Sequence, residues 1–351
     1  MCKQLKPEKI YKPHDFNKLP LPNFDIFHYK RNRRYTNVSG VNHLFPVDND
    51  ENDRLQHQHG ICYHVWGNHF SAPIEELLKK DGTKVLDVGC GPAMWTLEIA
   101  SLYPKARFTG VDIVPTYPIQ TKPRNVEFLQ ANIVKYGIPY EDNTFDYVFC
   151  RLMNFSFTIK DWKNVINEIC RVCKVGGYIE FMEKDVDLNV KESKKALSRF
   201  VKNLRRKNIE PIITPKIKQY IKETVNADIN HEKKDVPIGK WGGKIGEYNK
   251  EIIKWGADNL KIIMVEECDY DEKEWDLLLD SFMKELDHGK ILDNIHRIWA
   301  KKETEIRIND IEICECKPNF PQLQSFLPTD ISIKFQKFKN FIKNVHLITT
   351  Y

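Results

Sequence analysis

The sequence lacks the long apolar run that a membrane-spanning helix needs, since no stretch of its 351 residues approaches about 18 apolar residues in a row. The first 22 residues are charged and proline-rich, without the apolar segment of a secretory leader. Position 2 is Cys2 rather than glycine, so a myristoylation signal is missing as well. We therefore expect a cytoplasmic protein without a membrane anchor, with the nucleus as the alternative compartment.

A large excess of one charge is also missing. The sequence has 54 basic and 49 acidic residues and a formal net charge of +5. Proteins that bind polyanions usually carry a stronger or more clustered excess. The densest basic segment, Lys30–Arg34, is interpreted as a solvated loop in preference to an import or phosphate-binding patch. A nucleic acid is therefore not the expected partner.

The nine cysteines lack the arrangement of a metal site or a disulfide framework. Their number is odd, and we expect reduced thiols. Cys170 and Cys173 form a C-x-x-C, but neither a second such pair nor paired histidines accompany them. They lie in an amphipathic pattern that predicts a helix over 161–174 with Asp161 as its N-cap. We therefore interpret both as packing residues and predict no metal.

Strand and helix patterns alternate between Lys84 and Phe181. The predicted strands are 84–88, 108–111, 126–129, 145–150 and 178–181, and the predicted helices include 93–102 and 161–174. This alternation indicates an α/β fold, a Rossmann-like and mostly parallel sheet with helices on both faces. Later strands at 227–238 and 305–316 would complete a seven-stranded sheet whose last member is antiparallel.

The whole chain divides into five predicted segments. They are a basic, proline-rich arm (1–45), a helical lid segment (46–80), the cofactor-binding core (81–186), helical insertions with the late strands (187–316), and an amphipathic tail (317–351). The lid segment is expected to be helical in pieces, broken at Gly60, Gly67 and Pro73. The insertions are expected to contain helices over 191–206, 214–224, 246–264 and 271–287, with Gly289 after the last.

The strongest chemical signal is the turn that follows the first core strand, Asp87-Val-Gly89-Cys90-Gly91. Two glycines between a strand and a helix let a ligand approach the backbone closely. Dinucleotide-binding turns have a third glycine where this sequence has Met94, and Asp87 would repel a pyrophosphate. A cationic ligand fits better, and S-adenosylmethionine carries an ammonium and a sulfonium.

Two further polar residues follow the next strands. Asp112 comes 25 residues after Asp87 at the end of the second strand, where an acid meets the ribose hydroxyls of a nucleoside. Asn132 follows the third strand and has an amide that can pair with an adenine edge. Together with the glycine turn, these residues predict a nucleoside-binding edge of the sheet.

These motifs resemble those of class I S-adenosylmethionine-dependent methyltransferases. The closer similarity is to a branch abundant in fungi, the secondary-metabolism (UMTA- or TAM-like) methyltransferases, and covers roughly residues 31–290. It rests on Arg33-Arg34-Tyr35, on Phe45 to Glu51 with Asp53-Arg54-Leu55 and Gln58-His59, on Ile159 to Trp162, and on Pro237 to Trp241. Ala131-Asn132 departs from the acidic pair expected at this place.

The resemblance implies roles for individual residues. Asp87, Gly89 and Gly91 would hold the methionyl end, Asp112 the ribose and Asn132 the adenine. Further cofactor-binding residues implied by the resemblance are Cys90, Ile113, Ile133 and Arg151.

Methyl transfer is an in-line displacement for which the protein supplies position and dryness, so no universal catalytic group is expected. If the acceptor needs a base, the candidates are His57, His59, His64, Glu183 and Asp185. We predict a methyltransferase with a small-molecule acceptor. The alternatives are a non-catalytic, cofactor-binding regulatory protein and a protein methyltransferase. Nucleic-acid methylation is disfavoured, because the Asn/Asp-Pro-Pro-aromatic box and a Pro-Cys pair are both absent.

The acceptor pocket is expected at the carboxyl ends of the strands. Its predicted walls are the segment 58–70, with Tyr63 and Trp66, and the region around Trp241. We also expect the segment 55–70 to act as a lid that orders when cofactor binds.

Overall fold

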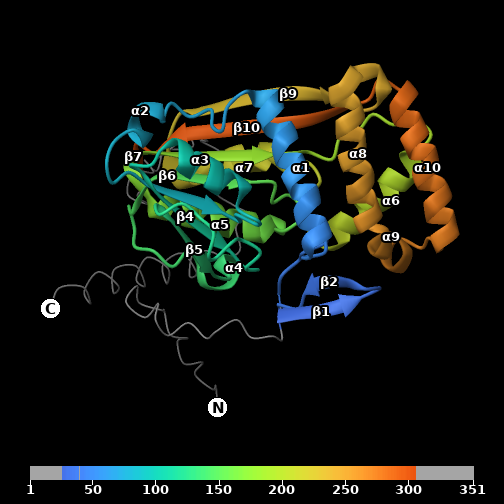
Figure 1. Cartoon of the computed structure of the whole chain (residues 1–351), viewed down its shortest axis with the longest axis horizontal. Coiled ribbons are helices and arrows are strands. Elements are labelled where there is room, and N and C mark those ends of the chain that lie inside the picture. The colour runs from blue at the N-terminus through green and yellow to red at the C-terminus, as the bar shows by residue number, and fades with distance from the viewer. Residues whose placement is uncertain (1–25, 39, 306–351) are drawn as a thin grey trace, which may run out of the picture. The chain divides into compact units, whose positions relative to one another are not determined.

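The computed structural model describes residues 26–38 and 40–305 (Figure 1). The predicted tail at 317–351 and the first part of the predicted arm lie outside these residues. Within the described ranges, no helix has the length and apolar character needed to cross a membrane.

A seven-stranded sheet forms the centre of the fold, with the strand order β5-β4-β3-β6-β7-β10-β9. The strands are β3 (Lys84–Val88), β4 (Arg107–Asp112), β5 (Val126–Gln130), β6 (Phe145–Arg151), β7 (Cys173–Glu183), β9 (Ile229–Pro237) and β10 (Leu292–Lys301). Strand β10 is antiparallel to both of its neighbours, while the pairs among β5, β4, β3, β6 and β7 are parallel. The predicted fold class is thereby confirmed, including its antiparallel last strand.

The sequence placed that last strand wrongly. Strand β10 begins at Leu292, whereas the predicted strand was 305–316, of which 306–316 lie outside the described residues. Residues Thr304–Glu305 instead form a two-residue strand, β11, that pairs with β8 (Val225–Asn226). Strand β10 buries Asp293, His296 and Arg297, so its sequence does not show the apolar run or alternation by which a buried strand is recognised.

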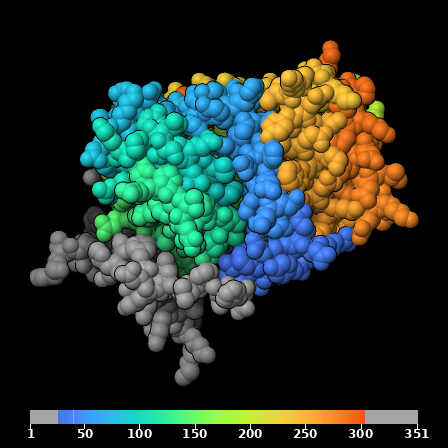
Figure 2. Space-filling model, viewed as in Figure 1, coloured from blue at the N-terminus to red at the C-terminus, as the bar shows by residue number. Residues whose placement is uncertain are grey.

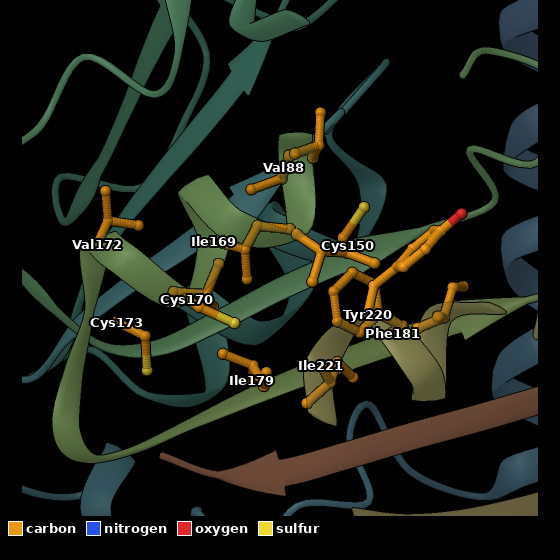
Figure 3. Packing of buried hydrophobic residues seen from close by; sticks show 14 of the residues in the cluster. Val88, Cys150, Ile169, Cys170, Val172, Cys173, Ile179, Phe181, Tyr220 and Ile221 are labelled. Carbon is orange, nitrogen blue, oxygen red and sulfur yellow. The ribbon is translucent and has the colours of Figure 1, made fainter. Parts of the chain in front are cut away.

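Apolar clusters cover both faces of the sheet. On one face, helices α5 (Ile159–Val172) and α7 (Thr214–Thr224) pack on the strands (Figure 3). Helices α1 (Asn49–Trp66), α3 (Met94–Leu102) and α8 (Gly243–Asn259) contribute to the cluster on the other face. Cys170 and Cys173 are both buried in the first cluster, which is the packing environment that the sequence indicated.

Helix α5 begins two residues earlier than predicted. Its N-cap is Thr158, whose hydroxyl accepts a hydrogen bond from the Asp161 N–H at 3.1 Å. The Asp161 carboxylate in turn accepts from the Thr158 N–H at 3.0 Å, which completes a capping box. Asp161 is therefore the third residue of the helix rather than its cap. The helix ends at Val172, so Cys173 is the first residue of β7.

The segment predicted to be helical in pieces contains the long helix α1 and the short helix α2 (Glu75–Leu78), with breaks at the predicted Gly67 and Pro73 but not at Gly60. Asp48 caps the start of α1 by accepting from the Glu51 N–H at 3.1 Å, and Gly67 ends it in the left-handed conformation with φ of 70°. Gly60 lies exposed inside the helix and does not break it. A single glycine costs about 1 kcal/mol relative to alanine, which a capped and packed helix tolerates.

Beyond β7 the chain adds four helices that form apolar clusters of their own, here called the cap: α6 (Lys194–Arg206), α8, α9 (Lys261–Glu267) and α10 (Glu272–His288). The predicted helix 246–264 is two helices, α8 and α9, which meet at Leu260. Gly289 follows α10 with φ of −81°, so it is not the left-handed cap expected from its type. In Figure 1, α1 crosses the molecule between the parallel strands and α8, and in Figure 2 its blue surface separates the cyan and green part from the gold part.

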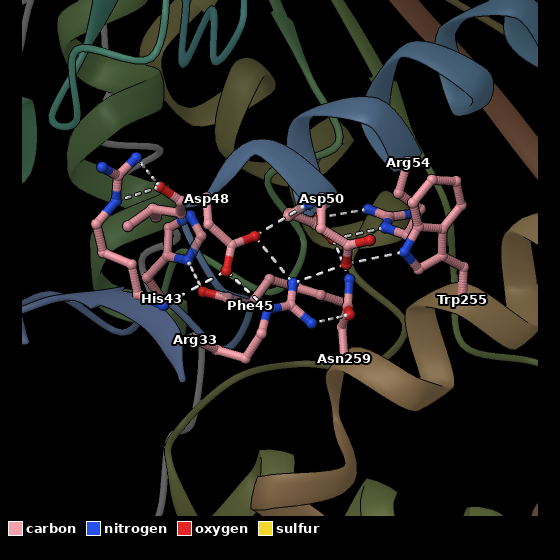
Figure 4. Close-up of polar contacts among 11 residues, drawn as sticks. Arg33, His43, Phe45, Asp48, Asp50, Arg54, Trp255 and Asn259 are labelled. Carbon is pink, nitrogen blue, oxygen red and sulfur yellow. Dashed lines mark hydrogen bonds and ion pairs between the residues drawn. The ribbon is translucent and has the colours of Figure 1, made fainter. Parts of the chain in front are cut away.

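The basic segment Lys30–Arg34 is not a solvated loop. Residues Phe27–Lys30 and Arg33–Thr36 form the hairpin β1–β2, and most of its cations are paired with acids on other elements. Arg33 donates to the Asp48 carboxylate at 2.7 Å and to the Asn259 side chain at 2.7 Å (Figure 4). The hairpin is thereby joined to the start of α1 and the end of α8, which explains why this basic cluster gives no free cationic patch.

A candidate cofactor and acceptor site

A cavity of about 400 Å³ opens at the carboxyl ends of the parallel strands. At one end it is lined by the turn after β3 and by residues that follow β4, β5 and β6. At the other end it is lined by the cap, mainly through apolar side chains. These are Ala196, Leu197, Phe200, Ile253, Ala257, Leu260, Met264, Trp275, Leu278, Leu279 and Phe282. The cavity therefore has a polar half on the sheet and an apolar half under the cap.

The turn after β3 favours glycine through its backbone conformation and, at Gly89, through a close neighbour as well. Gly89 and Gly91 have φ of 70° and 53°, in the left-handed region that disfavours larger residues. A Cβ atom added at Gly89 would lie 2.5 Å from the sulfur of Met153. Both glycines and Cys90 line the cavity, so the structure brings these three predicted residues to its wall.

Asp112 lines the cavity at the end of β4. Its two oxygens accept hydrogen bonds from the backbone N–H of Gly91 at 2.8 Å and of Val114 at 2.9 Å. Each oxygen keeps a second lone pair, because a carboxylate accepts about four hydrogen bonds. The carboxylate is thus oriented by the glycine turn and still able to accept two hydroxyl groups.

Asp87 lies behind the turn rather than in the cavity wall. The Thr96 hydroxyl donates to Oδ2, whereas Oδ1 has no partner among the described residues. The side chain is 2% exposed, and burial raises the pKa of Asp87 to about 6. A buried carboxylate with one unsatisfied oxygen is suited to a further donor or a nearby cation.

The remaining predicted residues of the nucleoside half also line the cavity. Asn132 accepts from the Lys135 N–H at 3.0 Å and thereby caps the short helix α4 (Ile133–Tyr136), so its carbonyl oxygen is engaged in the fold. Ile113 and Ile133 provide apolar surface beside it. The amide NH₂ of Asn132 is the group left for a ligand.

Arg151 ends β6 and faces the cavity. It is held by a hydrogen-bonded chain that runs from Arg151 through His59 to Glu98. Its guanidinium donates to Nδ1 of His59 at 2.8 Å, and Nε2 of His59 lies 2.8 Å from a Glu98 oxygen. Nδ1 must accept, so the proton of the neutral ring lies on Nε2 and points to Glu98. Burial, together with the Arg151 charge, lowers the pKa of His59 to about 4. His59 therefore positions Arg151, and both of its nitrogens are engaged.

Three of the predicted base candidates, His57, His64 and Glu183, lie outside the cavity. His64 is exposed and lines a separate, shallow depression with Lys234 and Pro237. Both oxygens of Glu183 accept backbone hydrogen bonds, from Met153 at 2.9 Å and Asn154 at 3.1 Å. Glu183 thus fixes the loop after β6, and burial raises its pKa well above the usual range.

Another candidate, Asp185, does line the cavity but caps helix α7. Its carboxylate accepts from the N–H groups of Ile213 at 2.9 Å and Thr214 at 3.1 Å, and from the Thr214 hydroxyl at 2.7 Å. His57, the remaining candidate, interacts with Tyr248 on the outer side of α1.

The aromatic residues expected in the acceptor pocket also lie elsewhere. Tyr63 and Trp241 do not line the cavity, and Trp66 packs beneath the cations of Lys234 and Arg297. Helix periodicity explains this result. The α1 residues that face the cavity recur at helical spacing, namely Glu51, Arg54, Leu55, Gln58 and His59. Tyr63 and Trp66 lie farther along α1, beyond His59, the last residue of the helix that lines the cavity.

Sequence reasoning missed one polar pair in the cavity wall. Lys184, directly after β7, forms an ion pair with Asp293 at the start of β10. The pair could not be predicted because strand β10 was not predicted at residues 292–301, and only this strand places residue 293 beside residue 184.

Residues 85–177 match the family model described as a methyltransferase domain. The chain carries a methyltransferase domain. Across 230 residues it is 26% identical to methyltransferase pytC of Aspergillus terreus, a match that covers 61% of this chain and 67% of pytC. It is 30% identical over 156 residues to the secondary metabolism regulator laeA of Coprinopsis cinerea, covering 44% of this chain and 38% of laeA.

Among solved structures, the chain is similar to phosphoethanolamine N-methyltransferase 2 of Haemonchus contortus in complex with S-adenosyl-L-methionine. The TM-score is 0.41 with 19% identity, and the match covers 77% of this chain and 62% of that one. The family match and the fungal relatives confirm the sequence-based predictions of an S-adenosylmethionine-dependent methyltransferase and of its fungal secondary-metabolism resemblance.

Proposed function

We propose that this methyltransferase domain acts on a small, largely apolar molecule bound beneath the cap. The observation that carries the proposal is the single cavity that runs from the glycine turn and Asp112 to the apolar side chains of α6, α8, α9 and α10. Ligand pockets for small molecules are typically apolar with a few polar groups, and their volumes begin at roughly 300 Å³.

We assign the polar half to the cofactor. The lone pairs left on Asp112 would accept the two ribose hydroxyls, and the Asn132 amide would meet the adenine. The methionyl end would lie over Gly89 and Gly91, with its ammonium attracted by Asp87 and its carboxylate facing Arg151. When bound, S-adenosylmethionine supplies the methyl group as an electrophile and the thioether as leaving group.

The protein orients the cofactor and the acceptor and excludes water from the site. Backbone and side-chain contacts already fix Asp112 and Arg151 before any ligand binds, so little ordering is needed at these positions. The apolar cap would hold an acceptor with its lone pair directed at the methyl group and would keep water away. In this division, the core segment 81–186 binds the cofactor and the helices within 187–316 provide the acceptor side. We further propose that it acts in the cytoplasm, because the six cysteines of the described residues are all free thiols.

A second candidate function is favoured by the similarity to laeA, which is named a regulator. A protein with that role would bind the cofactor and act through partner proteins, with or without methylating one. The enclosed, apolar half of the cavity supports the small-molecule proposal, because a regulator has no need for a chamber beside the cofactor.

Labelled cofactor separates these functions. The purified protein is incubated with methyl-labelled S-adenosylmethionine and a fungal cell extract, and the products are divided into an organic-soluble and a protein fraction. We expect the label in the organic-soluble fraction, and its loss with the Asp112→Ala variant. Label confined to protein would establish the protein methyltransferase instead, and cofactor binding without any transferred label would establish the regulator.

A further inference from the structure

We infer that the Lys184–Asp293 pair anchors an uncharged donor–acceptor group of the acceptor molecule, such as a hydroxyl, and thereby sets the polarity of the substrate. This inference rests on the proposed function, since it concerns the acceptor half of the same cavity. The charged groups in the cavity wall differ in the contacts that each one already makes.

Most of these charged groups are engaged by the fold. Glu51 and Arg54 pair with each other on α1, Asp161 belongs to the capping box of α5, and Asp185 caps α7. Asp112 and Arg151 belong to the cofactor half. Lys184 and Asp293 cap no helix and lie outside the nucleoside-binding turns. They also differ from Glu51 and Arg54, whose side chains have further side-chain partners in Asn259 and Gln58.

Strand order places the pair beyond the cofactor. The glycine turn follows β3, Arg151 ends the neighbouring strand β6, and Lys184 follows the next strand, β7. Asp293 lies on β10, the strand after that. The polar groups therefore extend along one edge of the sheet, from the cofactor turn to a point under the cap. A group bound at Lys184 and Asp293 would lie on the acceptor side of the cavity.

The pair retains hydrogen-bonding capacity for a ligand. Within the described part of the chain, the Lys184 ammonium has one partner, Asp293, and so keeps two of its three hydrogens. Oδ1 of Asp293 accepts only from the Asn294 N–H at 2.9 Å. A hydroxyl can accept from the ammonium and donate to the carboxylate at once. The pair is itself neutral, so a charged ligand group would remain uncompensated in an apolar chamber.

A purely structural pair is the competing explanation, and it predicts different behaviour. The side chains are 15% and 9% exposed, and a buried ion pair of this kind stabilises a fold little more than an apolar pair of similar volume. Replacing both residues together is therefore expected to preserve the fold, whereas replacing one would leave a buried charge without a partner. The double variant Lys184→Met/Asp293→Leu removes the hydrogen-bonding groups without that defect.

The chain offers a matched control. Lys250 and Asp287 form an ion pair at 2.8 Å between α8 and α10, with both side chains 14% exposed, and neither residue lines the cavity. The variant Lys250→Met/Asp287→Leu therefore makes the same chemical change at a similar depth, away from the proposed ligand.

The test uses three probes that share one apolar body: naphthalene, 2-naphthol and 2-naphthoate. Their binding to the full-length protein is measured by calorimetry in the presence of saturating S-adenosylhomocysteine, which lacks the sulfonium charge. We expect the wild type and the control variant to prefer 2-naphthol over both other probes. In the Lys184→Met/Asp293→Leu variant, 2-naphthol affinity should fall roughly 10- to 100-fold, as two lost hydrogen bonds predict, while naphthalene affinity stays within about threefold.

Two results would overturn the inference. One is a double variant that binds 2-naphthol as tightly as the wild type, which would make the pair structural. The other is a wild type without any preference for 2-naphthol. Failure of the proposed function has a different signature, namely that S-adenosylhomocysteine does not bind or that no organic-soluble methylated product forms.

Discussion

The two halves of the cavity are built in different ways. The cofactor half comes mainly from short segments that each follow a strand, and Asp112 is fixed there by the Gly91 and Val114 N–H groups. The acceptor half comes from α6, α8, α9 and α10, whose apolar residues meet only in the folded chain. A local motif can specify the first half, whereas the second depends on how distant helices pack. Changes in one half should therefore leave the other largely intact, and this separation can be tested.

The largest effect is expected at the glycine turn. Gly89→Val places side-chain atoms against Met153 and forces a branched residue into a left-handed conformation. We expect the backbone strain and the displacement of Met153 to cost roughly 3 kcal/mol of binding free energy or more. Cofactor affinity should then fall by more than about 100-fold. Calorimetry with S-adenosylhomocysteine measures it. Gly60→Ala is the control, because that glycine is exposed on α1 with open space around it, and it should bind normally.

Asp112→Ala should have the next largest effect. The loss of two hydroxyl contacts predicts about 1 to 3 kcal/mol of cofactor affinity. Acceptor-side binding of 2-naphthol without cofactor should stay unchanged in this variant. An unaltered cofactor affinity would remove Asp112 from the ribose site, and a parallel loss of 2-naphthol binding would show that the two halves are not separable.

The cofactor half should also respond to pH through Asp87. Burial raises its pKa to about 6, so the carboxylate is ionised at pH 7.5 and becomes neutral as the pH falls through 6. The neutral form no longer attracts the cofactor ammonium, and the affinity for S-adenosylhomocysteine should weaken roughly tenfold at pH 5, as linkage to one proton predicts. Asp87→Asn should bind more weakly at pH 7.5 and show a flat profile. A wild-type profile that is equally flat would contradict the role of Asp87.

The smallest effect is expected from Phe282→Ala on α10. Phe282 lines the apolar half, and its removal should weaken 2-naphthol binding by about 1 kcal/mol or more through lost apolar contact. Cofactor affinity should remain within about twofold. A larger change in cofactor affinity than in 2-naphthol affinity would reverse the assignment of the two halves.

The sequence predicted the two regions with different success, and the structure explains why. Strands β3 to β6 and the turn at Gly89–Gly91 were predicted because their signals are local: apolar runs, glycines and acids at strand ends. The base candidates His64 and Glu183 were misplaced, since the face of a helix and the partners of a buried carboxylate depend on tertiary contacts. Lys184 and Asp293 were missed for the same reason, because only the pairing of β7 with β10 brings them together.

Strand β9 has a consequence for how the molecule meets other copies of itself. It ends the order of the sheet and pairs with β10 along one side. Exposed strand edges can recruit a strand from another chain and so start aggregation. Between His231 and Asp235, β9 carries charges of both signs on exposed side chains, namely Glu232, Lys233 and Asp235. A neighbouring strand would have to bury these charges, so this edge of the sheet resists the addition of a strand from another copy.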